Sequence, residues 1–189
     1  MALARGRLVL VTGGARSGKS TFAERLALQS GKQVIYIATC LPGDEEMRQR
    51  IEEHRCRRPP SWTTVEEPLD PASIMGRYDN SGRCFLLDCL TLLVSNHLLR
   101  AAGQEGERVE PGYRDVGERV LALLGELASA VEKLQADAVL VTNEVGMGLV
   151  PEWPLGRLFR DLAGRANQCF AALADEVYLM VCGIPLQVK

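Results

Sequence analysis

Residues 7–20, RLVLVTGGARSGKS, determine the fold expected for this chain. The run RLVLVT is short, apolar and β-branched, and it stops at a pair of glycines. Residues 13–20 then match GxxxxGK[ST], the P-loop pattern of proteins that bind nucleoside triphosphates. The next stretch, residues 20–31, repeats apolar side chains at helical spacing and ends at a glycine. The segment is therefore predicted to form a strand, a phosphate-binding turn and a helix.

The P-loop predicts a site for a nucleoside triphosphate and Mg²⁺. Glycines let the backbone curl so that its N–H groups surround the β-phosphate, and the helix N-terminus adds positive potential. Lys19 is expected to bridge the phosphates as a catalytic residue, and Ser20 to hold Mg²⁺. The predicted nucleotide-binding residues of this segment are Gly13, Gly14, Ala15, Arg16, Ser17, Gly18, Lys19 and Ser20.

Further apolar runs predict a mostly parallel sheet with helices on both faces. Continuous apolar strands are typical of such sheets, and they occur at residues 33–38, 84–88, 139–142 and 177–181. Helical spacing of apolar side chains recurs at residues 112–134 and 155–173. The segment 101–112 has glycines, charges and a proline without a period, which predicts a mobile loop. The expected fold is an α/β, RecA-like P-loop NTPase with one domain, residues 1–189.

Composition excludes several classes of function. Hydrophobic residues make up 47% and charged residues 24% of the 189 residues, and a net charge of −2 gives no general attraction to nucleic acid. No segment approaches the roughly 20 apolar residues that span a bilayer, and no signal peptide is recognisable, so a cytoplasmic location is expected. The six cysteines contain no CxxC pair, which favours reduced thiols over zinc ligands or disulfides.

Two acidic residues follow predicted strands. Asp88 ends the run CFLLD, where it can hold magnesium through water or cap a helix. Glu144 is a second candidate for the metal, with a turn acid as the competing interpretation. The sequence has no NKxD element, so spacing does not identify the base of the nucleotide.

The stretch RIEEHRCRRPPSW, residues 50–62, contains His54 among arginines. A helix is predicted from Asp44, as N-cap, to the prolines that follow Arg58. Met47 and Ile51 share a helical face with His54, while Arg50 and Arg57 flank it. Nearby positive charge lowers the pKa of an imidazole and leaves a neutral nitrogen able to attack a phosphate. Spacing alone favours a partly buried structural histidine with solvated arginines.

Motifs along nearly the whole chain resemble one family, adenosylcobinamide kinase / adenosylcobinamide-phosphate guanylyltransferase. They are GGARSGKS (13–20), YIAT (36–39), DEEM…RI..HR..RP..W.T.E.P (44–68), TNEVGMGLVP (142–151) and GRLFRDLAGRANQ (156–168). The resemblance implies that ATP or GTP phosphorylates adenosylcobinamide. It also implies that GMP from GTP is carried by His54 to adenosylcobinamide phosphate, giving adenosylcobinamide-GDP. A homotrimer is implied in addition.

The resemblance assigns further nucleotide contacts. They fall on Ala38, Thr39, Cys40, Arg55, Cys56, Arg57, Arg58, Glu66 and Asp88. Glu66 is suited to accept a hydrogen bond from guanine, with a surface turn as the alternative. Glu144 and the polar side of residues 155–173 are assigned to the kinase site, to a subunit contact or to an ordinary solvated face; these residues are Arg157, Arg160, Asp161, Asn167 and Gln168.

Three functions follow from these observations. The first is the two-step enzyme; the second is a plain P-loop kinase with a structural His54; the third is a non-catalytic protein switched by a nucleotide. A P-loop holds the β- and γ-phosphates, whereas guanylylation needs the α-phosphorus in line with His54. The two-step hypothesis therefore predicts that the His54 helix moves relative to the sheet, with Pro42-Gly43 and Pro59-Pro60 bounding it.

Overall fold

The structure is a computed structural model that describes residues 5–41, 43, 45–56, 58–105 and 113–189. Asp44, Pro42 and Arg57, which entered the predictions for the His54 helix, lie outside these residues. The elements in chain order are β1 (Leu8–Gly13), α1 (Lys19–Gln29), β2 (Gln33–Ala38), α2 (Glu45–Cys56), β3 (Thr63–Glu66), α3 (Pro71–Tyr78), β4 (Arg83–Asp88), α4 (Leu90–Glu105), α5 (Tyr113–Glu132), β5 (Asp137–Val141), α6 (Pro154–Leu173), β6 (Glu176–Val181) and β7 (Ile184–Gln187).

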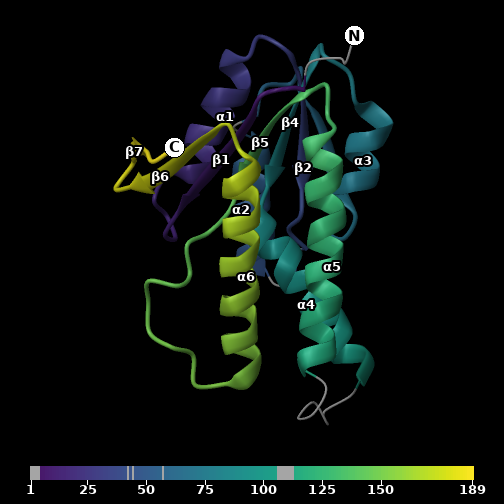
Figure 1. The fold of residues 1–189 in the computed structure, drawn as a ribbon. Helices are drawn as coiled ribbons and strands as arrows, with labels where there is room; N and C mark the ends of the chain where they lie inside the picture. The colour runs from purple at the N-terminus through teal and green to yellow at the C-terminus, as the bar shows by residue number, and fades with distance from the viewer. Residues whose placement is uncertain (1–4, 42, 44, 57, 106–112) are drawn as a thin grey trace.

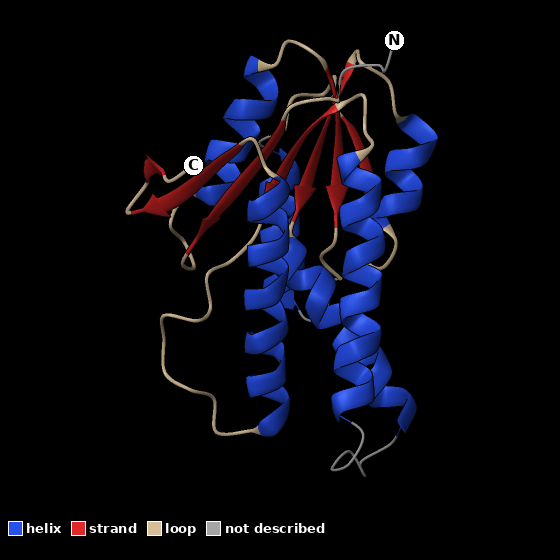
Figure 2. Cartoon of the chain, in the orientation of Figure 1, coloured by secondary structure: helices blue, strands red, loops and turns tan. Residues whose placement is uncertain are grey.

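One sheet contains all the strands formed by the described residues. Its order is β3-β2-β4-β5-β1-β6-β7, with every pair parallel except β6 with β7. The central arrows of Figure 2 accordingly point the same way, toward the bottom of the view. Strand β5 lies between β1, which leads into the P-loop, and β4, which ends at Asp88. The α/β fold expected from the sequence, with a mostly parallel sheet and a P-loop between β1 and α1, is confirmed.

Helices cover both faces of this sheet, as the apolar strands require. On one face, buried side chains of α3, α4, α5 and α6 pack with alternate residues of the strands, among them Phe85 and Leu140. On the other face, α1 contributes Phe22, Ala23 and Ala27 to a cluster that includes Tyr36. Figure 1 shows α5 and α6 in front of the sheet, with α1 behind it. The sheet thus separates two hydrophobic clusters.

Element boundaries agree closely with the sequence patterns, with one correction. Residues 101–105 were expected to belong to a mobile loop, but they form the last part of α4. The helix continues because Ala101 packs against the core beyond the buried Leu98. The remainder of the expected loop, 106–112, lies outside the described residues. The helix α4 was not predicted, and neither were the short elements α3, β3 and β7, each of which has too few residues to establish a period.

Apolar side chains are exposed on the edge strand β7 and on the connection that precedes α6. Ile184 of β7 and Val188, just after the strand, are each 62% exposed, and Leu149 of the connection is 96% exposed. Trp153, at the end of the same connection, is 74% exposed. Within the described part of the chain, no helix combines the length and the apolar character needed to cross a membrane.

Candidate functional site

The predicted site residues gather at the carboxyl ends of the parallel strands. The P-loop follows β1, Thr39 follows β2, and Asp88 closes β4. Glu66 ends β3, and Glu144 lies just beyond β5. In open α/β sheets, ligands bind in the crevice outside these strand ends. Residues spread over most of the sequence therefore lie along the carboxyl-terminal end of the sheet.

The P-loop has the tight backbone that its glycines allow. Gly13 has a φ of 146°, and a Cβ atom there would lie 2.6 Å from the carbonyl oxygen of Met180. Gly18, immediately before α1, has a φ of 92°. Arg16 between them also has a positive φ, 54°, which is uncommon for a residue with a side chain. The loop is thus curled directly onto the first turn of α1, where backbone N–H groups can receive a phosphate.

Lys19, the first residue of α1, is held inside the P-loop. Its side chain is 7% exposed, and its Nζ donates a hydrogen bond to the carbonyl oxygen of Gly14 at 2.5 Å. Burial lowers the pKa of Lys19, whereas the nearby groups of Cys89 and Asp88 act in the opposite direction. The ammonium group is therefore pre-positioned beside the loop that would surround a phosphate.

The carboxylates of Glu66 and Asp88 lie in one row across the carboxyl-terminal end of the sheet. Glu66 of β3 is paired in register with Ala38 of β2, and Ala38 with Asp88 of β4. Residues paired in this way project from the same face of the sheet. Tyr36, two residues before Ala38, packs in the cluster with Phe22 of α1, so the row is on the face that α1 and the P-loop cover. The small side chain of Ala38 separates the two acids.

Tyr36 connects this row to the segment that follows α2. Its hydroxyl donates a hydrogen bond to Oδ2 of Asp88 at 2.8 Å. The guanidinium of Arg58 lies over the tyrosine ring, 3.5 Å from its centroid. Burial, together with Asp88, raises the pKa of Tyr36, so its hydroxyl stays protonated and remains a donor.

Thr39 is committed to contacts within the chain. Its buried hydroxyl donates to the carbonyl oxygen of Cys89 at 2.8 Å and accepts from the Cys89 N–H at 2.7 Å. Its own N–H bonds to the carbonyl oxygen of Asp88, and its carbonyl oxygen accepts from Asn96. Thr39 therefore fixes the chain on either side of the Asp88-Cys89 peptide, and its expected contact with a nucleotide stays a prediction.

A buried polar network joins α4 and the residues just after β5 to α6. The hydroxyl of Thr142 donates to Oδ1 of Asn167 at 2.6 Å and lies 3.2 Å from the hydroxyl of Thr91. Asn167 Nδ2 donates in turn to the carbonyl oxygen of Asn143, whose N–H donates to Thr91. This network fixes the backbone just before Glu144.

Replacing Asn167 with alanine is expected to lower the free energy of unfolding by about 1–3 kcal/mol, because the hydroxyl of Thr142 and the carbonyl of Asn143 lose a partner in a confined site. Chemical denaturation measures this loss. The neighbouring exposed Gln168 is the control, and its change to alanine should alter stability by less than about 0.5 kcal/mol. Equal midpoints for the two variants would show that the network contributes nothing to stability.

Glu144 lines a cavity of about 290 Å³ beside the P-loop. Gly14 and Ser17 border it on one side, and Met180 with Cys182 on the other. The backbone N–H of Glu144 donates to the carbonyl oxygen of Gly13, and its Oε1 accepts from the N–H of Gly146 at 2.6 Å. The turn role considered from the sequence is therefore present, and a role in the kinase site stays a prediction.

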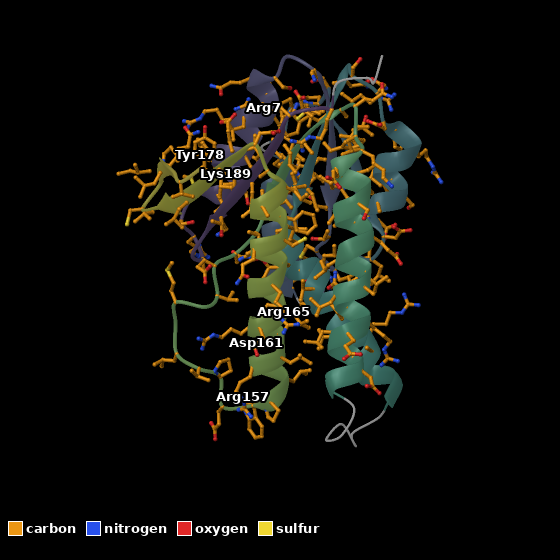
Figure 3. All side chains as sticks on the ribbon, viewed as in Figure 1. Arg7, Arg157, Asp161, Arg165, Tyr178 and Lys189 are labelled. Atoms are coloured by element: carbon orange, nitrogen blue, oxygen red, sulfur yellow. The ribbon has the colours of Figure 1, made fainter. Side chains whose placement is uncertain are left out.

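The remaining polar residues of α6 are placed differently from Asn167. Figure 3 shows Arg157, Asp161 and Arg165 along one side of the helix, and all are exposed. Arg157 donates to the carbonyl oxygens of Pro151 and Glu152, which fastens the preceding connection to the first turn. Asp161 and Gln168 are exposed as on a solvated face, whereas Arg160 is half-buried and its Nη1 has no hydrogen-bond partner among the described residues.

His54 lies on α2, two residues before its last residue, Cys56. The structure describes the backbone of this helix at His54 but not the placement of the side chain. Arg55 and Cys56 are exposed, whereas the guanidinium of Arg58 lies over the ring of Tyr36. The helix predicted around His54 is confirmed, and the approach of its imidazole to a nucleotide stays a prediction.

Comparison with known proteins assigns the family. The family model described as CobU, "Cobinamide kinase / cobinamide phosphate guanyltransferase", matches residues 9–188. The chain belongs to this cobinamide kinase / cobinamide phosphate guanyltransferase family. The resemblance expected from the motifs is confirmed, and the match contains the P-loop, α2 and the row of carboxylates.

Relatives of the cobinamide kinase family match over almost their whole length. The "Bifunctional adenosylcobalamin biosynthesis protein CobU" of Escherichia coli is 46% identical, covering 96% of this chain and 99% of that protein. The protein CobP of the same description from Pseudomonas aeruginosa is 45% identical, covering 95% and 96%. Among solved structures, the RadB recombinase matches with a TM-score of 0.48 and 16% identity, covering 94% of this chain and 75% of that one.

The donors at this family site fit a magnesium ion. Ser20, the second residue of α1, offers a hydroxyl, and Asp88 offers a carboxylate oriented by Tyr36. Mg²⁺ prefers oxygen ligands and is commonly held by one or two protein groups together with substrate phosphates. Both donors were predicted from the sequence, whereas Tyr36 appeared only within the motif YIAT and was given no role. Its hydroxyl among the apolar side chains of residues 34–38 was the available signal.

Proposed function

We propose that the chain catalyses two successive reactions on one corrinoid substrate. ATP or GTP first phosphorylates the hydroxyl of adenosylcobinamide, and GTP then supplies GMP to the new phosphate to give adenosylcobinamide-GDP. The family match over residues 9–188 supports both activities. The observation that carries the proposal is the meeting of the P-loop, Asp88 and the Arg58 segment on the α1 face of the sheet.

In the phosphorylation step, the P-loop would hold the β- and γ-phosphates of the nucleotide. Lys19 is placed to neutralise charge on the transferring phosphoryl group, because its ammonium already lies against the loop at Gly14. Ser20 and Asp88 would hold Mg²⁺, which would supply positive charge to offset that of the phosphates. Positioning and charge stabilisation account for most of the catalysis in such a transfer.

In the second step, His54 would act as a nucleophile. A neutral imidazole nitrogen attacks the α-phosphorus of GTP, the bond from that phosphorus to the bridging oxygen breaks, and pyrophosphate leaves. An oxygen of adenosylcobinamide phosphate then attacks the same phosphorus, the P–N bond breaks and the imidazole is restored. Movement of α2 toward the P-loop would bring the α-phosphorus in line with His54, and Glu66 is suited to accept hydrogen bonds from the guanine.

A product assay tests the whole proposal. The chain is incubated with adenosylcobinamide, Mg²⁺ and either ATP alone or ATP with GTP, and the corrinoids are separated by liquid chromatography. Adenosylcobinamide phosphate is expected with ATP alone, and adenosylcobinamide-GDP only when GTP is present. Formation of the phosphate alone under every condition would favour a plain kinase, and no product would favour a nucleotide-switched binding protein.

Asp88→Asn is expected to raise the Mg²⁺ concentration needed for half-maximal phosphorylation by about 10- to 100-fold, because an amide is a weaker magnesium ligand than a carboxylate. Initial rates measured across a magnesium series give this value. Asp175→Asn is a matched control, since Asp175 pairs with Arg5 away from the P-loop. An unchanged magnesium requirement in Asp88→Asn would remove Asp88 from the proposed metal site.

The assembly is proposed to be a homo-oligomer, with a trimer suggested by the family resemblance. Exposed apolar side chains support self-association, because an open edge strand can pair with another chain. They are Ile184 (62% exposed) and Leu186 (48%) of β7, and Val188 (62%) just after it. Light scattering after size-exclusion chromatography measures the assembly. A cytoplasmic location is also proposed, since both reactions consume nucleoside triphosphates.

A further inference from the structure

We infer that Tyr36 is a positioning residue that links Asp88, used in phosphorylation, to the segment next to the His54 helix, used in guanylyl transfer. Its hydroxyl orients Asp88 at the proposed metal site, and its ring supports Arg58 in the segment that follows the His54 helix. The inference deepens the proposed function and rests on it. Neither the family resemblance nor the motifs assign this tyrosine a role.

The hydrogen bond to Asp88 is donated by a buried side chain, that of Tyr36. Tyr36 is 2% exposed and lies on β2, and its hydroxyl reaches Oδ2 of Asp88 on the neighbouring strand β4. Asp88 is close enough to Lys19 to favour the charged ammonium. A hydrogen bond to one oxygen fixes the plane of a carboxylate, as outer partners of metal ligands commonly do. Tyr36 therefore determines how Asp88 faces the P-loop.

The contact with Arg58 involves the ring rather than the hydroxyl. The Arg58 guanidinium carbon lies 3.5 Å from the ring centroid, and Nη1 lies 3.5 Å from the hydroxyl oxygen of Thr64. Thr64 is paired in register with Tyr36, so both contacts fall on one row of the sheet. The Arg58 Nε is buried and has no hydrogen-bond partner among the described residues, so the ring face is its main support.

These two contacts join segments that are distant in sequence. Arg58 lies two residues beyond the end of α2 and four beyond His54, whereas Asp88 ends a strand next to β2. A shift of the Arg58 segment would move the cation off the ring that also holds Asp88. The position of the His54 helix and the geometry of the metal-binding carboxylate are therefore linked through Tyr36.

A purely structural role makes different predictions. In that case the ring of Tyr36 only fills the hydrophobic cluster between the sheet and α1, and its hydroxyl only provides a hydrogen-bond partner for Asp88. Tyr178 offers a matched comparison, because its ring packs on Phe22 in the same cluster and its hydroxyl donates to Glu176 at 2.7 Å. Glu176 is paired with Val9 near the other end of the strands, and Figure 3 marks Tyr178 and Arg7 in that region. Tyr178→Phe removes the same atom away from the proposed site.

The test measures binding rather than turnover. Mn²⁺ serves as a paramagnetic substitute for Mg²⁺, and its affinity is measured by electron paramagnetic resonance in the presence of a GTP analogue with a methylene group between the α- and β-phosphates. Tyr36→Phe is expected to weaken Mn²⁺ binding about 10-fold. Tyr178→Phe should leave it within about twofold of the unchanged protein, because Glu176 is not a proposed ligand.

A second variant separates the ring from the hydroxyl. Tyr36→Leu removes the support of Arg58 as well, and calorimetry at saturating Mg²⁺ should show about 10-fold weaker binding of the same analogue than in Tyr36→Phe, which keeps the ring. Thermal unfolding monitored by circular dichroism establishes that each variant is folded. If Tyr36→Leu does not fold, Tyr36→Phe alone decides the proposal through Mn²⁺ affinity.

Two outcomes distinguish this inference from the proposed function. Equal Mn²⁺ affinity in Tyr36→Phe and Tyr178→Phe would overturn the positioning role. Failure of the unchanged protein to retain GMP from GTP labelled at the α-phosphate would instead overturn the proposed guanylyl transfer, and the Mn²⁺ comparison would still decide whether Tyr36 orients Asp88.

Discussion

Replacing Lys19 with methionine is expected to lower the rates of both half-reactions by about 10²- to 10³-fold. Methionine has nearly the same length but carries no charge to offset that of the phosphates. Because burial already lowers the pKa of Lys19, removal of its charge should not reduce the free energy of unfolding by more than about 1 kcal/mol. The loss should therefore appear in rate rather than in folding.

Lys32 supplies the control for this variant. It lies just before β2, at the opposite end of the strand from Ala38, where its Nζ forms an ion pair with Asp137 at 2.8 Å. Lys32→Met should retain at least about half of both activities, since this partly buried ion pair lies at the end of the sheet opposite the P-loop. Rates within threefold of each other for the Lys19 and Lys32 variants would contradict the role of the P-loop lysine.

Replacing His54 with alanine should separate the two reactions. Guanylyl transfer is expected to fall by at least about 10³-fold, because no other group would form the phosphoramidate, whereas phosphorylation of adenosylcobinamide should change by less than about threefold. Chromatography of the corrinoid products measures both rates in one sample.

His97, the other histidine of the chain, is the matched control. Its Nε2 lies 2.8 Å from the carbonyl oxygen of Leu69, a contact that joins α4 to the segment before α3. His97→Gln should support both reactions at near-normal rates. Normal GMP transfer by His54→Ala would make His54 structural and leave the plain kinase as the better description.

Local sequence patterns were sufficient for the P-loop and for most of the strands. A glycine-rich turn between an apolar strand and a helix is a local feature, so residues 8–29 could be assigned without any tertiary contact. The segment 101–105 was misassigned because the loop prediction followed its glycine and the glycines, charges and proline after it, rather than the high helix propensity of its two alanines. Packing of Ala101 against the core extends α4 through them.

Contacts between strands could not be predicted in the same way. The row of Glu66, Ala38 and Asp88 depends on the register of β3, β2 and β4, and sequence patterns do not specify which strands are neighbours. The hydrogen bond from Tyr36 to Asp88 spans 52 positions in the sequence for the same reason. Thr39 was assigned to the nucleotide from a motif, whereas its hydroxyl is bonded to the backbone of Cys89.

His54 shows the limit of reasoning from spacing. The helical spacing of Met47, Ile51 and His54 is as compatible with a structural histidine as with a nucleophile, and α2 formed as predicted in either case. Only the order of motifs along the whole chain favoured catalysis, and the match over residues 9–188 confirms the family on which that expectation depended.

The most direct test is to identify the group that remains on the protein after reaction with GTP. The chain is incubated with GTP and Mg²⁺ without corrinoid, denatured in base, digested and analysed by mass spectrometry, with α- and γ-labelled GTP in parallel samples. A single GMP attached to the peptide containing His54, with label from the α-phosphate only and release in acid, is the predicted result. A protein that retains no α label, or retains GMP on a residue other than His54, would contradict the proposed mechanism.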